Sequence, residues 1–398
     1  MLKKRLVVIF LIFSSQFLIL PVQAGGPFFV DLSGSGIPLT WGDPLTWVAD
    51  AGALNGRISN ETAVSWIKEL FGVWQGATLE DAAGVPVPAA TLNVEYGGLV
   101  KGDIGVKNYI ESVEDVPADV VVIFDPSGEI IDDMFGDKSR NYIVGFAYVM
   151  GGKGEHFYGG FLVLNGLFID GDTANPEISE SKFKAAILHE IGHALNLDHT
   201  QANIEAVERF EGGDASLAGE IPTMYPVLYT EDQLVPHTDD VIALAELYPS
   251  QDYAGSFCRI EGELAGADGQ GLQGADVVAR AKDSAYEWSD VRTFVSGVSY
   301  PAETASGKYI LGGIVPDRGY IVGYRSISQS FTGGSSIAPY DPPRGDIAES
   351  VISKEVVACS SGGGGVQMDT SAFTSVLQDS SDTGTAPSGG CSLIKPEK

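Results

Sequence analysis

The sequence predicts a mixed α/β (α+β) domain built on a twisted mixed sheet, followed by a small all-β domain. Up to about residue 250, continuous apolar runs suited to buried strands alternate with amphipathic stretches suited to helices. After Pro249–Asp252, short runs of alternating apolar and polar residues are separated by turns rich in Gly and Pro, which is typical of an antiparallel sandwich. We therefore expect domains at 25–250 and 255–355, and a disordered Gly- and Ser-rich tail at 360–398.

The first 24 residues have the pattern of an export signal. Basic residues at positions 3–5 precede the apolar run Leu6–Leu20, and the small residues Val22 and Ala24 stand where a signal peptidase cleaves. The apolar run is short for a membrane span, and an uncleaved anchor is the alternative. We expect cleavage after Ala24, a secreted extracellular protein, and no membrane span in the mature chain.

Acidic residues outnumber basic ones by 53 to 24, which disfavours binding to nucleic acid and to anionic lipid surfaces. Some of these carboxylates are candidates for structural Ca²⁺ sites, because extracellular proteins often hold this ion. The candidates are Asp132, Asp133 and Asp137 in one cluster, and Asp170 and Asp172 in another. A generally solvated acidic surface is the alternative.

The three cysteines are too few for a disulfide scaffold. Cys258 and Cys359 bracket the second domain and could pair after export to an oxidising compartment. Cys391 is then left over.

Each element of the first domain is predicted from its own pattern. The predicted strands are Leu45–Ala49, Asp119–Phe124, Ile143–Val149 and Gly159–Gly166. The predicted helices are Asn60–Phe71, a helix capped by Ser179 or Ser181 that continues through Ala194, and Asp239–Leu247.

The chemistry of the chain is predicted from the segment HEIGHALNLDH, which runs from His189 to His199. His189 and His193 are four residues apart on one helix, so both imidazoles lie on the same face and can reach one ion. Glu190 stands beside them, where its carboxylate can accept a proton from water. His199 can join them if the chain turns at Asn196, a residue type that tolerates the left-handed backbone.

Three histidines leave one tetrahedral position open, which is typical of a catalytic rather than a structural zinc site. Imidazole ligands favour Zn²⁺, and they also suit copper or iron. The other two histidines, His156 and His237, lack partners at ligand spacing and are expected to be surface or core residues.

The histidine segment resembles the zinc signature HExxHxxGxxH of metzincin endopeptidases, closest to the matrixin branch. Asn196 stands where that signature has Gly. Downstream, Pro222–Pro226 resembles the methionine-containing turn of this family, which implies that Met224 forms an apolar floor beneath the metal ligands. The resemblance implies a secreted zinc metalloendopeptidase that hydrolyses peptide bonds with a zinc-activated water and Glu190 as general base. We expect the protein to be a monomer.

The same resemblance implies an edge strand that binds an extended substrate, because an exposed edge offers unpaired backbone groups. The stretch Gly159–Gly166 fits this role, with Phe161, Leu162, Val163 and Leu164 as the candidate substrate-strand residues. An ordinary internal strand is the alternative interpretation.

The segment from Cys258 to about Ile327 resembles the carboxypeptidase regulatory-like, prealbumin-type sandwich, which implies a role as a spacer or adhesion module. The stretch SGGCSLI around Cys391 is similar to the start of bacterial surface-sorting tails, which would imply association with the cell surface. The competing hypothesis for the whole protein is a catalytically silent extracellular adhesin or binding protein that uses the metzincin scaffold.

Overall fold

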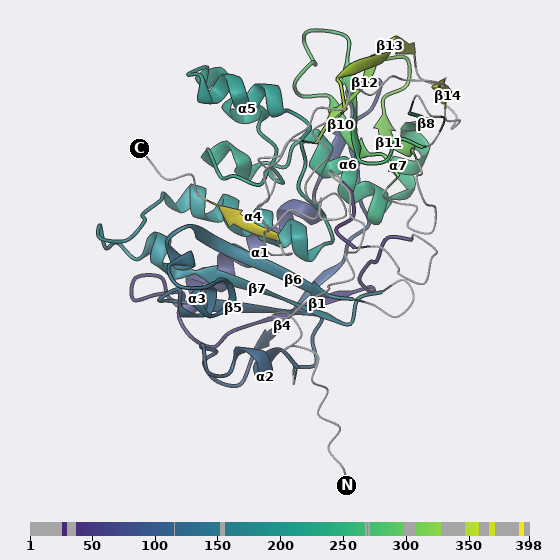
Figure 1. The fold of residues 1–398 in the computed structure, drawn as a ribbon. Coiled ribbons are helices and arrows are strands. Elements are labelled where there is room, and N and C mark those ends of the chain that lie inside the picture. Colours follow the sequence, from purple (N-terminus) through teal and green to yellow (C-terminus); the bar gives the residue numbers. More distant parts are fainter. Residues whose placement is uncertain are drawn as a thin grey trace.

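The computed structural model describes residues 26–29, 37–114, 116–151, 156–266, 269, 271–297, 307–327, 347–357, 366–370 and 390–393. The expected export signal and Cys359 lie outside these residues. Figure 1 shows an α/β part built on one sheet, with a smaller β part packed above it. The predicted class, a mixed α/β domain with a mixed sheet followed by separate, mainly antiparallel sheets, is confirmed at this level.

Among the described residues, the first sheet has the strand order β15-β6-β7-β5-β1-β4. Strands β4, β1, β5 and β7 run parallel, whereas β6 is antiparallel to β7 and β15 is antiparallel to β6. The bounds of these strands are β1 (Leu45–Ala49), β4 (Val94–Leu99), β5 (Val120–Asp125), β6 (Ile143–Met150), β7 (Gly159–Asn165) and β15 (Gly390–Leu393). A short hairpin joins β2 (Thr78–Glu80) to β3 (Pro86–Pro88).

Helices cover both faces of this sheet. On one face, α1 (Asn60–Gln75) and α4 (Glu180–Ala194) share a core with Val120, Val122 and Phe124 of β5. On the other face, α2 (Tyr109–Glu114) and α3 (Glu129–Phe135) pack over Val121 and Ile123. The alternation of β5 side chains between two cores explains why its sequence is apolar throughout.

The expectation that Gly159–Gly166 is an edge strand is wrong. Strand β7 is hydrogen-bonded to β5 on one side and to β6 on the other, so Phe161, Leu162, Val163 and Leu164 lie in an internal strand. The edge strands among the described residues are β15 and β4, and β6 lies between β7 and β15.

Short helices connect the two parts of the molecule. They are α5 (Ile204–Glu211), α6 (Thr238–Leu247) and α7 (Gln251–Ser256), with 3₁₀ turns at Ser139–Asn141, Gly166–Ile169, Ala215–Glu220 and Glu231–Leu234. No helix of the described part of the chain is long and apolar enough to cross a membrane.

The described residues of the second part form two sheets that share one core. The first sheet holds β9 (Ala275–Ala281), β10 (Val291–Val295), β12 (Gly319–Ser326) and β13 (Ser350–Val357), and the second holds β8 (Cys258–Leu264), β11 (Lys308–Ile314) and β14 (Val366–Thr370). Ile260 and Leu311 from one sheet pack with Val277 and Val322 from the other, as expected for a sandwich. Cys258 is disulfide-bonded.

Two segments of the expected disordered tail are strands. Strand β14 runs parallel to β8 in the second part, and β15 returns to the first sheet. The expectation of disorder therefore does not hold for 366–370 and 390–393.

Candidate metal centre

Helix α4 carries the histidine motif and is fixed at both ends. Ser179 caps its start, with the hydroxyl oxygen accepting a hydrogen bond from the Lys182 amide at 3.1 Å. Two buried indoles hold its later turns: Trp74 donates to the Leu188 carbonyl at 3.0 Å, and Trp41 donates to the Ala194 carbonyl at 2.6 Å. Helix α4 is therefore held by Trp41, which precedes β1, and by Trp74 of α1.

The chain leaves α4 through a Schellman turn. The Leu197 amide donates to the Gly192 carbonyl and the Asn196 amide donates to the His193 carbonyl, each at 2.9 Å. Asn196 occupies the left-handed position with φ of 76°, as its sequence position predicts. This turn ends the helix and carries the chain back toward His199.

The side chain of Asn196 has a second role that glycine could not perform. Its Oδ1 accepts from the Phe29 amide at 2.7 Å, and its Nδ2 donates to the carbonyls of Phe29 at 2.9 Å and Leu39 at 2.6 Å. The Phe28 amide also donates to the Asn196 carbonyl at 2.7 Å. Asn196 thus fastens the N-terminal segment across the turn that follows the helix.

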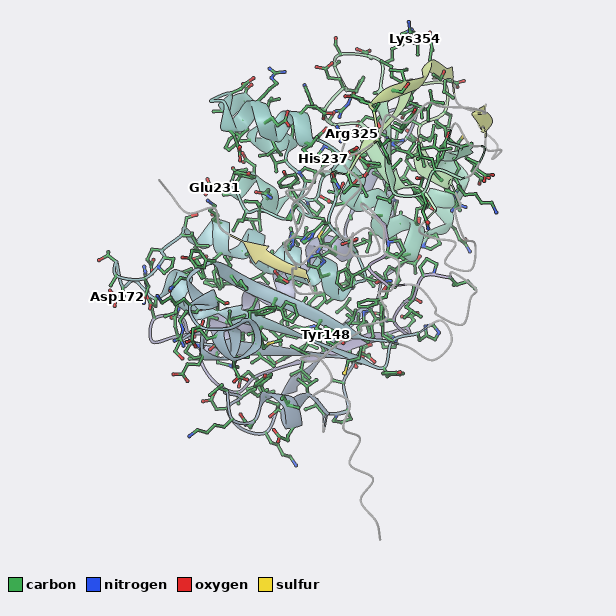
Figure 2. All side chains as sticks on the ribbon, viewed as in Figure 1. Tyr148, Asp172, Glu231, His237, Arg325 and Lys354 are labelled. Carbon is green, nitrogen blue, oxygen red and sulfur yellow. The ribbon has the colours of Figure 1, made fainter. Side chains whose placement is uncertain are left out.

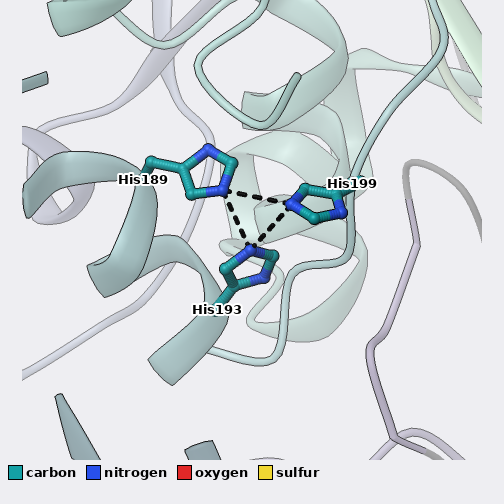
Figure 3. A group of neighbouring side chains, drawn as sticks. All are labelled: His189, His193 and His199. Carbon is teal, nitrogen blue, oxygen red and sulfur yellow. Dashed lines mark hydrogen bonds between the residues drawn. The ribbon is translucent and has the colours of Figure 1, made fainter. Parts of the chain in front are cut away.

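The three expected ligands converge, and their Nε2 atoms form a small triangle (Figure 3). The Nε2 atoms of His189 and His193 are 3.0 Å apart, and each lies 3.2 Å from Nε2 of His199. All three rings are buried. Among the described residues, this is the only group of three or more His, Cys, Asp or Glu side chains close enough to hold a metal ion.

Hydrogen bonds to carbonyl oxygens decide the tautomer of two of these rings. Nδ1 of His189 donates to the Thr223 carbonyl at 2.7 Å, and Nδ1 of His193 donates to the Leu197 carbonyl at 2.8 Å. Because a carbonyl can only accept, the proton of each neutral ring resides on Nδ1 and the lone pair resides on Nε2. The two lone pairs therefore point at the same small volume, an arrangement that repels unless a cation lies between them.

The electrostatics of the site favour neutral rings. Burial lowers the pKa of His189 to about 4, although the hydrogen bond to Thr223 opposes the shift. Burial also lowers the pKa of His193 and His199 well below the usual value, and repulsion from the neighbouring rings adds to the effect. A divalent ion binds only unprotonated imidazole, so the three rings are ready for a metal at neutral pH.

The donor set fits zinc. Nitrogen ligands of a tetrahedral zinc ion, each about 2.0–2.1 Å from the metal, stand about 3.3 Å apart. The observed separations of 3.0 to 3.2 Å are close to this value. The carbonyl groups of Thr223 and Leu197 supply the outer hydrogen bonds that orient ligand histidines in metal sites.

Met224 lies directly beneath the helix that bears the ligands. It is buried, and a Cβ atom added at Gly192 would stand only 2.3 Å from its sulfur. Gly192 is therefore required for the close approach between α4 and the methionine. The apolar side chain of Met224 thus packs against α4 at Gly192.

One carboxylate holds the methionine turn in place. Asp240 accepts hydrogen bonds from the amides of Thr223 at 2.8 Å, Met224 at 3.2 Å and His237 at 2.8 Å. Burial raises the pKa of Asp240 to about 7, while these amides oppose the shift. Because the Thr223 carbonyl orients His189, Asp240 supports the metal site through the turn.

Glu190 is fully buried on α4 and faces strand β6. A Cβ atom added at Gly145 of β6 would stand 2.9 Å from Cγ of Glu190, so the strand passes close against the carboxylate side chain. Only glycine permits this contact. The structure therefore brings together the Nε2 atoms of His189, His193 and His199, while Glu190 follows His189 on α4 and Met224 packs against Gly192 of the same helix.

The remaining sequence candidates lie apart from this centre. His156 is exposed and its Nδ1 is 3.4 Å from the Thr40 hydroxyl, whereas His237 is buried and caps α6. Both are thus the surface and core histidines that their isolation in the sequence predicts. Figure 2 shows His237 between the two parts of the molecule.

The calcium candidates form no group of three acidic side chains among the described residues. Asp132 pairs with Arg140 at 2.5 Å, and Asp133 accepts from the Tyr109 hydroxyl at 2.9 Å. Asp170 accepts from the Asn175 amide group at 2.7 Å. Figure 2 places Asp172 at the outer margin of the sheet part.

The sequence did not indicate that two arginines of the second part bind residues 201–203, which follow His199. Arg325 of β12 donates to the Gln201 carbonyl at 2.6 Å and pairs with Glu205 and, at 2.9 Å, with Asp276. Arg280 of β9 donates to the Ala202 carbonyl at 2.9 Å and to the Asn203 side chain at 2.8 Å. Figure 2 shows Arg325 at this junction.

A third connection joins the second part to helix α6. The Thr293 amide of β10 donates to Asp239 at 2.7 Å, and the Thr200 hydroxyl donates to the same carboxylate. The sandwich is thus docked on the residues that immediately follow the third histidine. A spacer joined only through a linker would not make these contacts.

The chain matches no model of a known protein family, and no curated protein matches it.

Proposed function

We propose that this chain is a secreted zinc-dependent endopeptidase of the metzincin type, closest to the matrixins. The observation that carries the proposal is the convergence of three Nε2 atoms within 3.2 Å of one another, with two tautomers fixed by carbonyl hydrogen bonds. Glu190 follows His189 on the same helix and is the carboxylate that we assign to this centre. The methionine turn beneath it supports the comparison with metzincins.

His189, His193 and His199 would hold the ion. When bound there, zinc supplies a Lewis acid that acidifies water and polarises a carbonyl group. The three imidazole ligands are neutral, so they would not offset the positive charge with which the ion acts on water and the carbonyl group. Their burial and their outer hydrogen bonds keep them in place without rearrangement.

Glu190 is proposed as the general base. A carboxylate accepts the proton of the attacking water and then passes it to the departing amine, which completes hydrolysis of the peptide bond. The neighbouring strand fixes the Glu190 side chain, since Gly145 leaves just enough room for its methylene groups. Proton transfer from a positioned side chain contributes about 10²- to 10⁴-fold to a rate.

A peptide is the substrate class that suits the surroundings. Strand β6 passes beside Glu190 and is the last strand of the sheet before β15. The outer side of such a strand offers backbone amides and carbonyls that pair with an extended chain. An extended polypeptide on β6 would therefore lie next to the proposed base.

Export remains part of the proposal. The N-terminal sequence pattern and the disulfide at Cys258 support an extracellular site of action, because disulfides persist in oxidising compartments. The acidic composition favours solubility there.

Digestion of casein or gelatin by the purified full chain tests the proposal. We expect cleavage that a zinc chelator abolishes and that added Zn²⁺ restores. A metal-loaded protein that cleaves neither substrate would support the adhesin hypothesis instead. Cleavage that is insensitive to the chelator would point to a contaminating protease and overturn the assignment.

A further inference from the structure

The C-terminal segment of the chain lies on the outer side of β6. Strand β15 pairs antiparallel with β6, and the paired positions are Gly390 with Ala147, Cys391 with Phe146, Ser392 with Gly145, and Leu393 with Ile143. Figure 1 shows β15 as the yellow arrow beside β6, and it lies against α4 as well. A segment more than 200 residues away in the sequence thus becomes the outermost strand of the sheet.

This pairing brings the C-terminal strand next to the proposed base. Ser392 is paired with Gly145, and Gly145 is the residue whose Cα faces Cγ of Glu190. Strand β15 therefore pairs with β6 at the position where β6 passes Glu190 of α4. Any extended polypeptide that pairs with this part of β6 must occupy the same backbone hydrogen-bonding groups.

We propose that residues Gly390–Leu393 are an intramolecular peptide ligand that occupies the substrate-binding edge of β6. The pairing itself stands on the sheet topology alone, whereas competition with a substrate rests on the proposed endopeptidase function. Strand β15 occupies this edge of β6, and a free peptide substrate has to displace it.

The physical basis is strand addition. An uncovered β6 would present a row of unpaired amides and carbonyls, and β15 satisfies them along four paired positions. A tethered segment acts at an effective concentration of about 1 mM, so even a weakly bound strand is occupied most of the time. If the Kd of the β15 segment for the β6 edge is tenfold below this concentration, the apparent KM for a free peptide rises about tenfold.

The test uses the full chain with proline in the ligand segment. In an antiparallel ladder, neighbouring residues alternate in whether their amides face the partner strand, so Cys391→Pro with Ser392→Pro must remove an amide that faces β6. Ser380→Pro with Ser381→Pro is the matched control, because it places the same number of prolines in the same tail but outside β15. Neither pair replaces a proposed ligand or Glu190.

Two readings separate this inference from the proposed function. Amide hydrogen exchange of β6 reports the pairing without any need for activity, and KM for a peptide substrate reports the competition. We expect faster exchange at 143–147 and about a tenfold lower KM in the β15 variant, with neither change in the control.

Faster exchange without peptidase activity in any variant would remove the endopeptidase proposal and leave the intramolecular ligand standing. Unchanged exchange in β6 would overturn the ligand itself. Faster exchange with an unchanged KM would overturn its role as a competitor.

Discussion

Asn196 and Phe29 bind each other through both the donor and the acceptor of each residue. Asn196 Oδ1 accepts from the Phe29 amide at 2.7 Å, and Asn196 Nδ2 donates to the Phe29 carbonyl at 2.9 Å. The same Asn196 adopts the left-handed backbone, with φ of 76°, that turns the chain toward His199. One residue therefore has a conformational role and a hydrogen-bonding role, and substitutions can separate them.

Asn196→Gly should keep the turn and lose the attachment of the N-terminal segment. Glycine adopts the left-handed backbone without strain, but the partly buried Phe29 amide loses its partner, at a cost of about 1–3 kcal/mol. The Phe29 carbonyl keeps the hydrogen bond from the Leu39 amide. We expect a lower melting temperature, faster amide exchange at 28–29, and retained zinc affinity.

Asn196→Ala adds backbone strain of about 1–2 kcal/mol at the same position. Zinc affinity should therefore fall in the alanine variant but not in the glycine variant. Equal zinc affinity of the two variants, measured by competition with a chromophoric chelator, would show that the turn does not position His199.

Glu190→Gln should separate metal binding from turnover. The amide is nearly the same size as the carboxylate and fits beside Gly145, but it cannot accept the proton of water. We expect one bound zinc per chain and a kcat reduced by about 10²- to 10⁴-fold. Metal analysis and peptide hydrolysis on the same sample measure both, and full activity in this variant would exclude Glu190 as the base.

Arg325→Met should weaken the site from the second part of the molecule. The change leaves Asp276, which is fully buried, without its 2.9 Å partner and removes the hydrogen bond to the Gln201 carbonyl. Removing one member of a buried ion pair costs about 3–5 kcal/mol. We expect a lower free energy of unfolding and a lower zinc affinity, because the segment after His199 loses its support.

The matched control is Lys282→Met. Lys282 pairs with Glu355 on the surface of the same sandwich, where the two side chains are 48% and 51% exposed. Exposed pairs contribute about 0–1 kcal/mol, so neither stability nor zinc affinity should change appreciably. A cobalt-substituted protein offers a second reading, since its visible spectrum reports ligand geometry independently of stability. Unaltered spectra and zinc affinity in Arg325→Met would limit this residue to a purely structural role.

Asp239→Asn should change how stability depends on pH. Burial raises the pKa of Asp239 from 3.8 to about 8, so the folded chain keeps a proton that the unfolded chain releases between these values. The stability that this proton provides is present at low pH and is lost as pH rises through about 8. Asparagine does not titrate, and its amide oxygen can accept from the Thr293 amide as the Asp239 carboxyl does.

We therefore expect the wild type to lose stability relative to the asparagine variant between about pH 4 and pH 8. Urea unfolding at several pH values measures the difference. Parallel curves for the two proteins would contradict the assignment of a proton to Asp239.

Local patterns predicted the convergence of the three histidines, because these residues lie within one helix and one turn. The spacing of His189 and His193 fixes their common face, and the residue type at 196 allows the turn. Strands β1, β5, β6 and β7 and helices α1, α4 and α6 were also predicted from periodicity, whereas β4, α2, α3 and α5 were not. The order of the strands in the sheet was not predicted. The apolar run of β7 would be the same in an internal strand and in an edge strand, because the sequence does not show which strands lie beside it.

Contacts between distant residues could not be predicted at all. Arg325 and Gln201 are separated by 124 positions, and no local pattern connects an arginine in a sandwich strand with a carbonyl beside a metal ligand. Asp240 was placed in a predicted helix, but its three hydrogen bonds to the methionine turn depend on how that helix packs. The pairing of β15 with β6 of the first sheet is likewise a contact between distant residues that no local pattern indicates.

Titration of metal-free protein with Zn²⁺ tests the central claim most directly, with peptide hydrolysis measured after each addition. Three converging imidazoles form one site, so activity should rise in proportion to added zinc and reach its plateau at one equivalent per chain. Binding of one equivalent with no hydrolysis at any point, or activity that does not follow site occupancy, would contradict the account.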